Sequence, residues 1–103
     1  MMGEFNLEEL ASFSDNNVVS KNLYDSQKAC VNLICLEEGQ TALEDTIGQK
    51  VVVVINTGNG SVITGGGEQG VEEGTLILFE SDEKRLLKAK TKMTALVTAI
   101  PKG

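Results

Sequence analysis

The sequence predicts a single all-β domain that begins with one short helix. After residue 17 the chain is a succession of short segments rich in Val, Ile, Leu and Thr, separated by clusters of Gly, Asn, Asp and Glu. Many short strands with regular turn signals are typical of a β-sandwich or β-barrel. A length of 103 residues suits one hydrophobic core and is short for two. We therefore expect one domain over residues 1–103.

A helix is expected over about residues 6–14, because Leu7, Leu10 and Ala11 recur at helical spacing. Asn6 can cap its first turn, and Glu9 stands three residues later in the position of a capping box. The polar run 14–17 ends the pattern. We expect this helix to pack across one edge or mouth of the β-domain.

The rest of the chain, about 18–101, is expected to form the barrel. The predicted strands are 18–24, 29–36, 40–43, 49–56, 61–64, 75–79, 85–90 and 93–100. The strongest is 49–56, where four consecutive valines precede an isoleucine. The glycines between strands are interpreted as turn residues that allow positive φ. No Lys-Ser or Lys-Thr pair follows them directly, as it would in a phosphate-binding loop.

Two of these segments, 51–55 and 76–79, are apolar at every position. In a strand, alternate residues point to opposite faces of the sheet, so both faces should be covered. A domain of this size leaves much of its surface exposed when alone. We therefore expect a homodimer in which a second protomer covers the outer face.

Composition excludes several classes of partner. The net charge is −6, whereas nucleic-acid binding needs Lys and Arg to neutralise phosphates. We expect neither a nucleic-acid nor a membrane partner. The longest apolar run, 51–55, is too short to span a bilayer. The N-terminal residues lack the basic and apolar regions of a signal peptide, which favours a cytoplasmic location.

The cysteines also favour a cytoplasmic location. Cys30 and Cys35 share one predicted strand, about 16 Å apart and on opposite faces, so they cannot pair with each other. We expect two reduced, buried thiols. Tyr24, Phe79 and Met93 are also expected in the core. The lysines near the C-terminus are expected to form a solvated face: Lys84, Lys88, Lys90 and Lys92.

The segment 36–79 resembles a small single-domain cupin. The first cupin motif runs from a glycine through a His-x-His pair and a glutamate to a second glycine, and Gly39 and Gly58 stand at those two ends. Gly74 before the apolar run 75–79 fits the opening of the second motif, and 93–100 closing on Pro101 fits the final strand. The resemblance extends over about 18–101. It implies an RmlC-like double-stranded β-helix, or jelly-roll barrel, preceded by the short helix.

The positions of the family's metal ligands carry other residues. The histidine positions of the first motif fall on Asp45 and Ile47, and the glutamate position falls on Val51. The third histidine position falls near Arg85, and the usual proline of the second motif is Glu80. The chain has no histidine, and imidazole is the ligand that suits the metals of cupins. The resemblance therefore implies a barrel without a metal or other cofactor, and these five positions are the candidate ligand-binding site.

Three functions follow from this resemblance. The first, which we favour, is a non-catalytic module that binds a small polar or carboxylate ligand. Asp45 and Arg85 would orient the ligand near the pocket mouth, because the planar guanidinium of arginine suits carboxylates. The alternative role for Arg85 is an ion pair with Asp82 or Glu83 on a solvated hairpin.

The second function is that of a structural or interaction protein, whose barrel is filled by Ile47 and Val51 and which acts through its dimer surface. The third is a metal-free enzyme, with general acid–base groups drawn from four residues: Asp45, Glu80, Tyr24 or Lys50. The volume of the pocket separates the first function from the second, because a cavity lined by Ile and Val would be small and dry.

Overall fold

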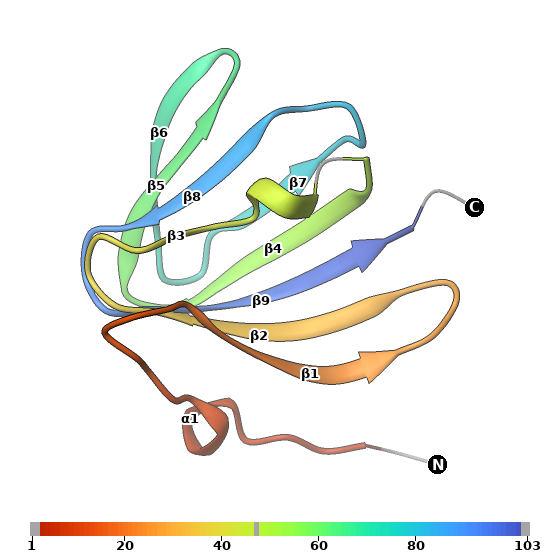
Figure 1. The fold of residues 1–103 in the computed structure, drawn as a ribbon, viewed down its shortest axis with the longest axis vertical. Coiled ribbons are helices and arrows are strands. Elements are labelled where there is room, and N and C mark those ends of the chain that lie inside the picture. Colours follow the sequence, from red (N-terminus) through yellow and green to blue (C-terminus); the bar gives the residue numbers. More distant parts are fainter. Residues whose placement is uncertain (1–2, 47, 102–103) are drawn as a thin grey trace.

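The computed structural model describes residues 3–46 and 48–101, which form two antiparallel β-sheets that face each other (Figure 1). The larger sheet has the strand order β1 (Val19–Asp25), β2 (Cys30–Leu36), β9 (Met93–Ile100), β4 (Lys50–Thr57) and β7 (Leu76–Phe79). The smaller sheet has the order β3 (Thr41–Ala42), β8 (Arg85–Ala89), β5 (Asn59–Thr64) and β6 (Gly67–Glu72). A short helix α1 (Leu7–Leu10) precedes the sheets, and a 3₁₀ turn η1 (Glu44–Thr46) follows β3.

The hydrophobic core lies between the two sheets. Alternate residues of β4 point inward, and Val51, Val53 and Ile55 are at most 1% exposed. Leu87 of β8 packs into the same cluster from the smaller sheet, and Phe79 of β7 joins it from the larger sheet. The strands predicted over 49–56 and 93–100 are therefore confirmed, and so are the core positions of Phe79 and Met93.

The N-terminal helix is shorter than predicted. Asn6 caps it as expected, since its side-chain oxygen accepts a hydrogen bond from the Glu9 amide at 3.1 Å. Ala11, however, has an extended backbone, so the helix ends there and not at residue 14. Short helices gain little stability alone. Contacts further along hold the chain extended instead: Phe13 lies under the Lys92 ammonium, and Ser14 accepts a hydrogen bond from the Gln40 side chain.

One strand was missed, because its sequence is polar and rich in glycine. β6 reads Gly-Glu-Gln-Gly-Val-Glu, and among its residues Val71 alone is buried. It pairs with β5 and forms an edge of the smaller sheet. An edge strand contributes few side chains to the core, so its sequence carries little of the apolar alternation by which strands are recognised.

Tyr24 was also placed wrongly, since its side chain is 57% exposed. The pairing of β1 with β2 shifts register between Asn22 and Tyr24, which changes the face to which later residues point.

The two cysteines are free as predicted, although Cys30 is half-buried and only Cys35 is buried. The lysine face at positions 84, 88, 90 and 92 is exposed as expected. No helix in the described part of the chain has the length and apolar character needed to cross a membrane.

Candidate functional site

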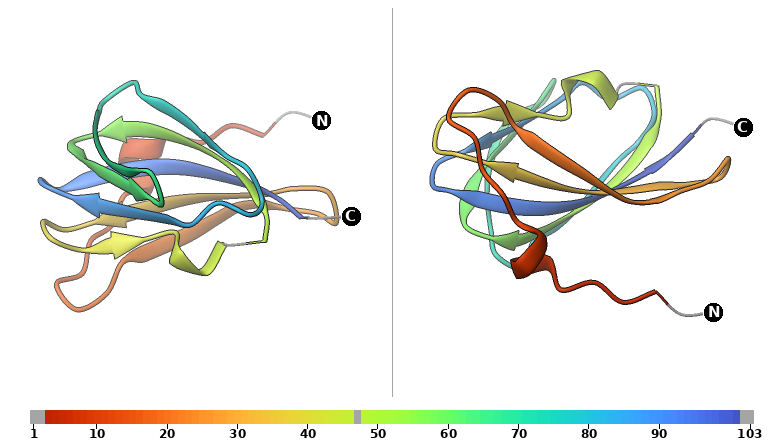
Figure 2. Two further views of the ribbon diagram at one scale, coloured as in Figure 1. Left: turned by 90° about the horizontal axis from the view of Figure 1, so that it is seen from above. Right: turned by 60° about the horizontal axis from the view of Figure 1, so that its bottom comes forward.

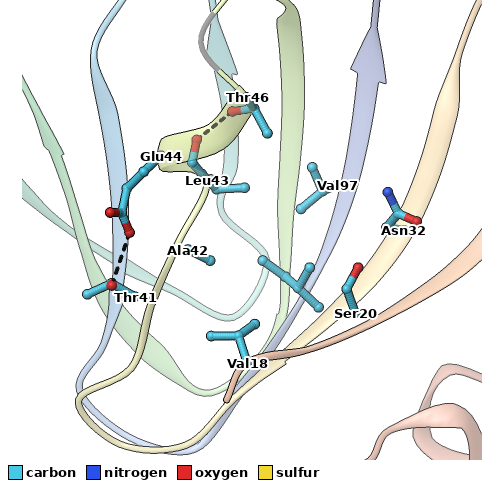
Figure 3. A pocket seen from close by; sticks show the side chains of 10 residues that line it. Val18, Ser20, Asn32, Thr41, Ala42, Leu43, Glu44, Thr46 and Val97 are labelled. Carbon is cyan, nitrogen blue, oxygen red and sulfur yellow. Dashed lines mark hydrogen bonds between the residues drawn. The ribbon is translucent and has the colours of Figure 1, made fainter.

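A cavity of about 450 Å³ opens between the two sheets, beside the apolar core (Figure 3). Strands β1, β2 and β9 form one wall, and β3 with η1 forms the other. The described residues that line it are Val18, Ser20, Asn32, Ile34, Thr41, Ala42, Leu43, Glu44, Thr46 and Val97.

The register of the larger sheet explains how these side chains come together. Ser20 lies opposite Ile34 in the β1–β2 pair, and Asn32 lies opposite Val97 in the β2–β9 pair. Residues that are directly opposite on adjacent strands project from the same face of the sheet. Polar and apolar groups therefore alternate on the inner face, near the β1 edge.

Neighbouring groups hold several of the polar side chains in place. Glu44 accepts a hydrogen bond from the Thr41 hydroxyl at 3.1 Å, and Asn32 accepts one from the Asn22 amide at 3.0 Å. The Thr46 hydroxyl donates to the Leu43 carbonyl at 2.6 Å. The cavity thus presents oriented hydroxyl, amide and carboxylate groups above an apolar surface, the usual composition of a small-molecule site.

Leu43 has an unusual backbone conformation in the wall of this cavity. Its φ is +80°, and it is the sole non-glycine residue with positive φ in the described part of the chain. The left-handed region costs a bulky residue about 1–2 kcal/mol, and such strain tends to cluster at functional sites. Here the Leu43 side chain is 5% exposed and packed into the core, which stabilises the turn from β3 into η1. That turn places Glu44 and Thr46 in the wall.

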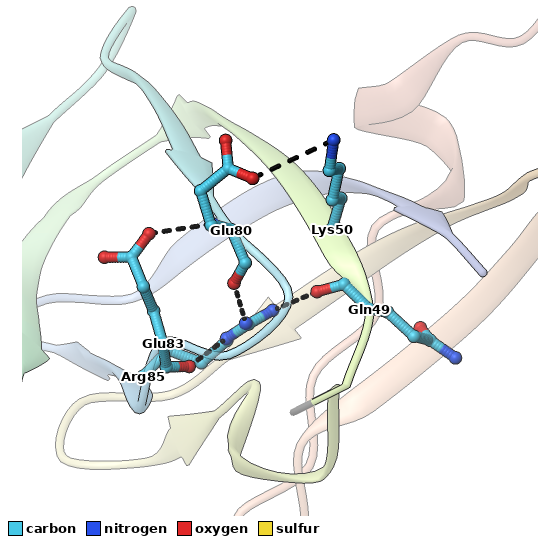
Figure 4. Close-up of polar contacts among 5 residues, drawn as sticks. All are labelled: Gln49, Lys50, Glu80, Glu83 and Arg85. Carbon is cyan, nitrogen blue, oxygen red and sulfur yellow. Dashed lines mark hydrogen bonds and ion pairs between the residues drawn. The ribbon is translucent and has the colours of Figure 1, made fainter. Parts of the chain in front are cut away.

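Arg85 occupies a different environment from the one expected. It is 3% exposed, and its guanidinium donates to backbone carbonyls of two loops (Figure 4). Nε donates to Glu83 at 3.0 Å, Nη1 to Gln49 at 2.9 Å, and Nη2 to Glu80 at 2.6 Å. A longer bond of 3.4 Å joins Nη1 to the Thr46 carbonyl. The guanidinium also lies 5.1 Å from the centre of the Phe79 ring.

The predicted ion pair of Arg85 with Asp82 or Glu83 on a solvated hairpin is therefore wrong. Arg85 is buried, and its bond to Glu83 is to the carbonyl oxygen, while the Glu83 carboxylate accepts from the Glu80 amide at 2.8 Å. Arg85 joins the loop after η1 to the loop between β7 and β8.

The other predicted site residues are dispersed. Val51 is fully buried in β4, opposite Phe79. The Glu80 side chain is 57% exposed and lies 3.9 Å from the Lys50 ammonium. Ile47 lies outside the described residues, and so does the side chain of Asp45. The Glu80 backbone meets Arg85, but Val51, Glu80 and Arg85 are not among the described residues that line the cavity.

The sequence prediction missed the polar groups that do line the cavity. One signal was present, because Asn32 interrupts an otherwise apolar run from 29 to 36. A polar residue inside a buried strand needs a hydrogen-bond partner, and its presence there indicates a polar feature of the interior. The hydroxyl groups of Ser20, Thr41 and Thr46 gave no comparable signal, since Ser and Thr are common in exposed strands and turns.

Solved structures resemble this chain along its whole length. An RmlC-like cupin protein from Desulfovibrio desulfuricans is 22% identical, with a TM-score of 0.86 and coverage of 98% of each chain. A cupin superfamily protein from Desulfitobacterium hafniense is 14% identical, with a TM-score of 0.87 and coverage of 99% of this chain and 94% of that one. The chain has the cupin fold. The predicted double-stranded β-helix is thereby confirmed.

At sequence identities this low, the similarity to cupin structures shows the fold alone. A conserved protein of unknown function from Streptococcus pyogenes is similar to the same degree, with 16% identity, a TM-score of 0.85, and coverage of 100% of this chain and 90% of that one. No family model matches the sequence, and no curated protein matches it.

The residues present do not fit the metal that the cupin fold implies. Among the described residues, no group of three or more His, Cys, Asp or Glu side chains is placed to hold an ion. At the position that resembles the third histidine stands the buried cation Arg85. A fixed positive charge in a poorly solvated site repels a metal ion, so the donor set and the local charge both disfavour one.

Proposed function

We propose that this protein is a metal-free, non-catalytic cupin-type module that binds a small polar ligand. The observation that carries the proposal is the cavity of about 450 Å³ whose polar groups are already held by hydrogen bonds. Ligand sites in proteins have volumes of roughly 300–1,000 Å³ and combine apolar walls with a few placed polar groups. A ligand entering this cavity would find those groups pre-organised, which lowers the entropic cost of binding.

The lining favours a ligand that carries hydroxyl or amino groups. Glu44 is the one charged group among the described lining residues, and it is a carboxylate. The Arg85 guanidinium, which would suit a carboxylate ligand, lies outside this lining and donates to backbone carbonyls. A neutral or positively charged ligand with an apolar portion is therefore a better match than an organic acid.

Two observations favour this function over the alternatives. A filled barrel would leave no space of this size between the sheets, whereas here a cavity of about 450 Å³ opens beside the closed core around Val51 and Val53. The acid–base candidates Tyr24, Lys50 and Glu80 have exposed side chains and are not among the described lining residues.

We further infer a reducing, cytoplasmic location, supported by the free thiols of both cysteines.

Titration of ¹⁵N-labelled protein tests the proposal. The ligands are monosaccharides, short amino alcohols and dicarboxylates of similar size, each followed by amide chemical shifts. We expect hydroxyl- or amino-bearing compounds to shift the amides of Ser20, Asn32, Thr41 and Thr46, and dicarboxylates to leave them unchanged. Shifts that occur only with dicarboxylates, or only far from these strands, would contradict the proposal.

Matched variants locate the binding. Ser20→Phe places a ring at the cavity wall and should abolish the shifts, while Glu44→Gln should weaken an amino ligand about tenfold through loss of a charge-assisted hydrogen bond. Glu38→Gln removes the same charge from an exposed turn outside the lining and should leave the affinity unchanged. Equal weakening by Glu38→Gln and Glu44→Gln would show a general charge effect and not a site.

A further inference from the structure

A second cavity lies on the face of the larger sheet that points away from the core, where the segment that contains α1 crosses the sheet (Figure 2). We call it the α1 cavity, since it lies between residues 7–13 and the ends of β4 and β9 that meet there. Its volume is about 300 Å³, within the range of small-molecule sites. Leu7, Ala11 and Phe13 form an apolar wall. The α1 cavity shares no described lining residue with the cavity between the sheets.

A β-bulge gathers the polar side chains of the α1 cavity. The pairing of β4 with β9 passes from Ile55 opposite Ala95 to Thr57 opposite Thr94, so Asn56 is an extra residue between them. In a regular strand, consecutive side chains point to opposite faces of the sheet. Here Asn56 and Thr57 both reach the Thr94 hydroxyl, at 3.2 Å and 2.8 Å. Bulges of this kind redirect side chains and are common beside functional sites.

This polar cluster lies in apolar surroundings. Thr94 is 3% exposed, and its partner on β2 is the fully buried Cys35. Polar groups in such places are normally hydrogen-bonded, and the bond to Thr94 uses one of the two amide hydrogens of Asn56. A ligand in the α1 cavity can therefore meet the second amide hydrogen and the side-chain oxygen of Asn56.

The lining of the α1 cavity also carries one group of each charge. The Lys92 ammonium lies 4.4 Å from the centre of the Phe13 ring and 3.9 Å from the Glu37 carboxylate. The Lys92 side chain is 59% exposed, so its ion pair is weak and its ammonium has donors left for a ligand carboxylate. Glu8, in the first turn of α1, supplies the negative charge.

We propose that the α1 cavity binds an apolar α-amino acid as its zwitterion. Lys92 binds the carboxylate, and Glu8 binds the ammonium group. Leu7, Ala11 and Phe13 hold the side chain. A simple carboxylic acid would bring a second negative charge to Glu8, and a simple amine would bring a second positive charge to Lys92, so the zwitterion is the better match. This site is independent of the cavity between the sheets and of the function proposed for it.

Titration of ¹⁵N-labelled protein with L-leucine tests the proposal, and two analogues separate the charges. 4-Methylpentanoate lacks the amino group of leucine, and 3-methylbutylamine lacks its carboxylate. We expect leucine to shift the amides of Asn56, Thr57 and Thr94 in a saturable manner. Each analogue should bind about fivefold more weakly, because one exposed ion pair contributes up to that factor.

Three results of this titration would overturn the proposal. The first is the absence of any saturable shift with leucine. The second is an affinity for either analogue equal to that for leucine, since the site would then recognise a single charge. The third is a set of shifts confined to Ser20, Asn32, Thr41 and Thr46, which would place leucine between the sheets and leave the proposed function standing.

Matched variants locate the two charges. Lys92→Met should weaken leucine binding about fivefold, and Lys92→Arg should restore it, because arginine keeps the charge and suits carboxylates. Lys90→Met removes the same charge from an exposed position outside the described lining and should leave the affinity unchanged. Glu8→Gln and its exposed neighbour Glu9→Gln give the same comparison for the negative charge. Equal weakening within either pair would overturn the assignment.

Discussion

At the scale of single residues, Arg85 is the clearest departure from a metal-binding barrel. Its guanidinium gathers the carbonyl oxygens of Gln49, Glu80 and Glu83 around one positive charge, much as a bound cation gathers oxygen ligands. The motif spacing identified the position of Arg85 in the sequence. It could not predict the partners, because backbone carbonyls carry no side-chain signature and come from loops far apart in the chain.

Loss of this guanidinium should destabilise the fold. Hydrogen bonds to charged groups contribute about 1.5–3 kcal/mol each, and several act together here, so Arg85→Met should lower the free energy of unfolding by about 3 kcal/mol or more. Arg85→Lys keeps the charge but not the planar set of donors, so its free energy of unfolding should lie between those of Arg85→Met and the wild type. Urea unfolding at one fixed protein concentration measures the loss. The exposed neighbour provides a control, since Lys84→Met should change stability by less than about 0.5 kcal/mol. Equal stability of the variants at 84 and 85 would show that the carbonyl contacts contribute nothing.

At the scale of elements, the turn between β4 and β5 depends on Gly58. Its φ is +81°, and a Cβ there would lie 2.3 Å from the Lys92 carbonyl oxygen and 2.7 Å from the Met93 Cβ. Gly74 also has a positive φ, +89°, but a Cβ there would meet no atom within 4 Å. Substitutions at these two glycines therefore allow the cost of backbone strain to be measured separately from the cost of steric overlap.

Alanine at these two positions should have different effects. Gly74→Ala should lower the free energy of unfolding by about 1 kcal/mol, the cost of a left-handed conformation for a residue with Cβ. Gly58→Ala adds a clash with the backbone that begins β9, and should cost at least about 2 kcal/mol more. Urea unfolding of both variants measures the difference. Similar losses at the two positions would mean that the close approach to Lys92 and Met93 relaxes at little cost.

Elements were predictable where burial imposes a pattern. β4 was found because its run of valines and isoleucine is typical of a buried strand, and Asn6 was found because capping is a local interaction. β6 was not found, because it is an edge strand that buries Val71 alone. The end of α1 was misplaced because distant partners, Gln40 and Lys92, hold the following residues extended.

At the scale of the whole molecule, the cupin fold could be predicted from glycine spacing and apolar runs, whereas the cavity could not. Its walls come from β1, β2, β9 and the β3–η1 segment, and only the strand order brings Ser20, Asn32 and Glu44 to one place. The family's ligand positions directed attention to Val51, Glu80 and Arg85, which are outside the described lining. The prediction of a covered outer face stays a prediction, and in the single chain Leu76 and Leu78 are exposed.

Native mass spectrometry tests most directly our proposal that this cupin barrel holds a small polar molecule and no metal ion. The protein is weighed as purified, and again after addition of equimolar Fe²⁺, Ni²⁺ or Zn²⁺. We predict that any mass retained on purification is that of a small organic molecule, and that the added metals bind no more than adventitiously. Retention of one transition-metal ion per chain would contradict the account, because it would require ligands that the described residues around Arg85 do not supply.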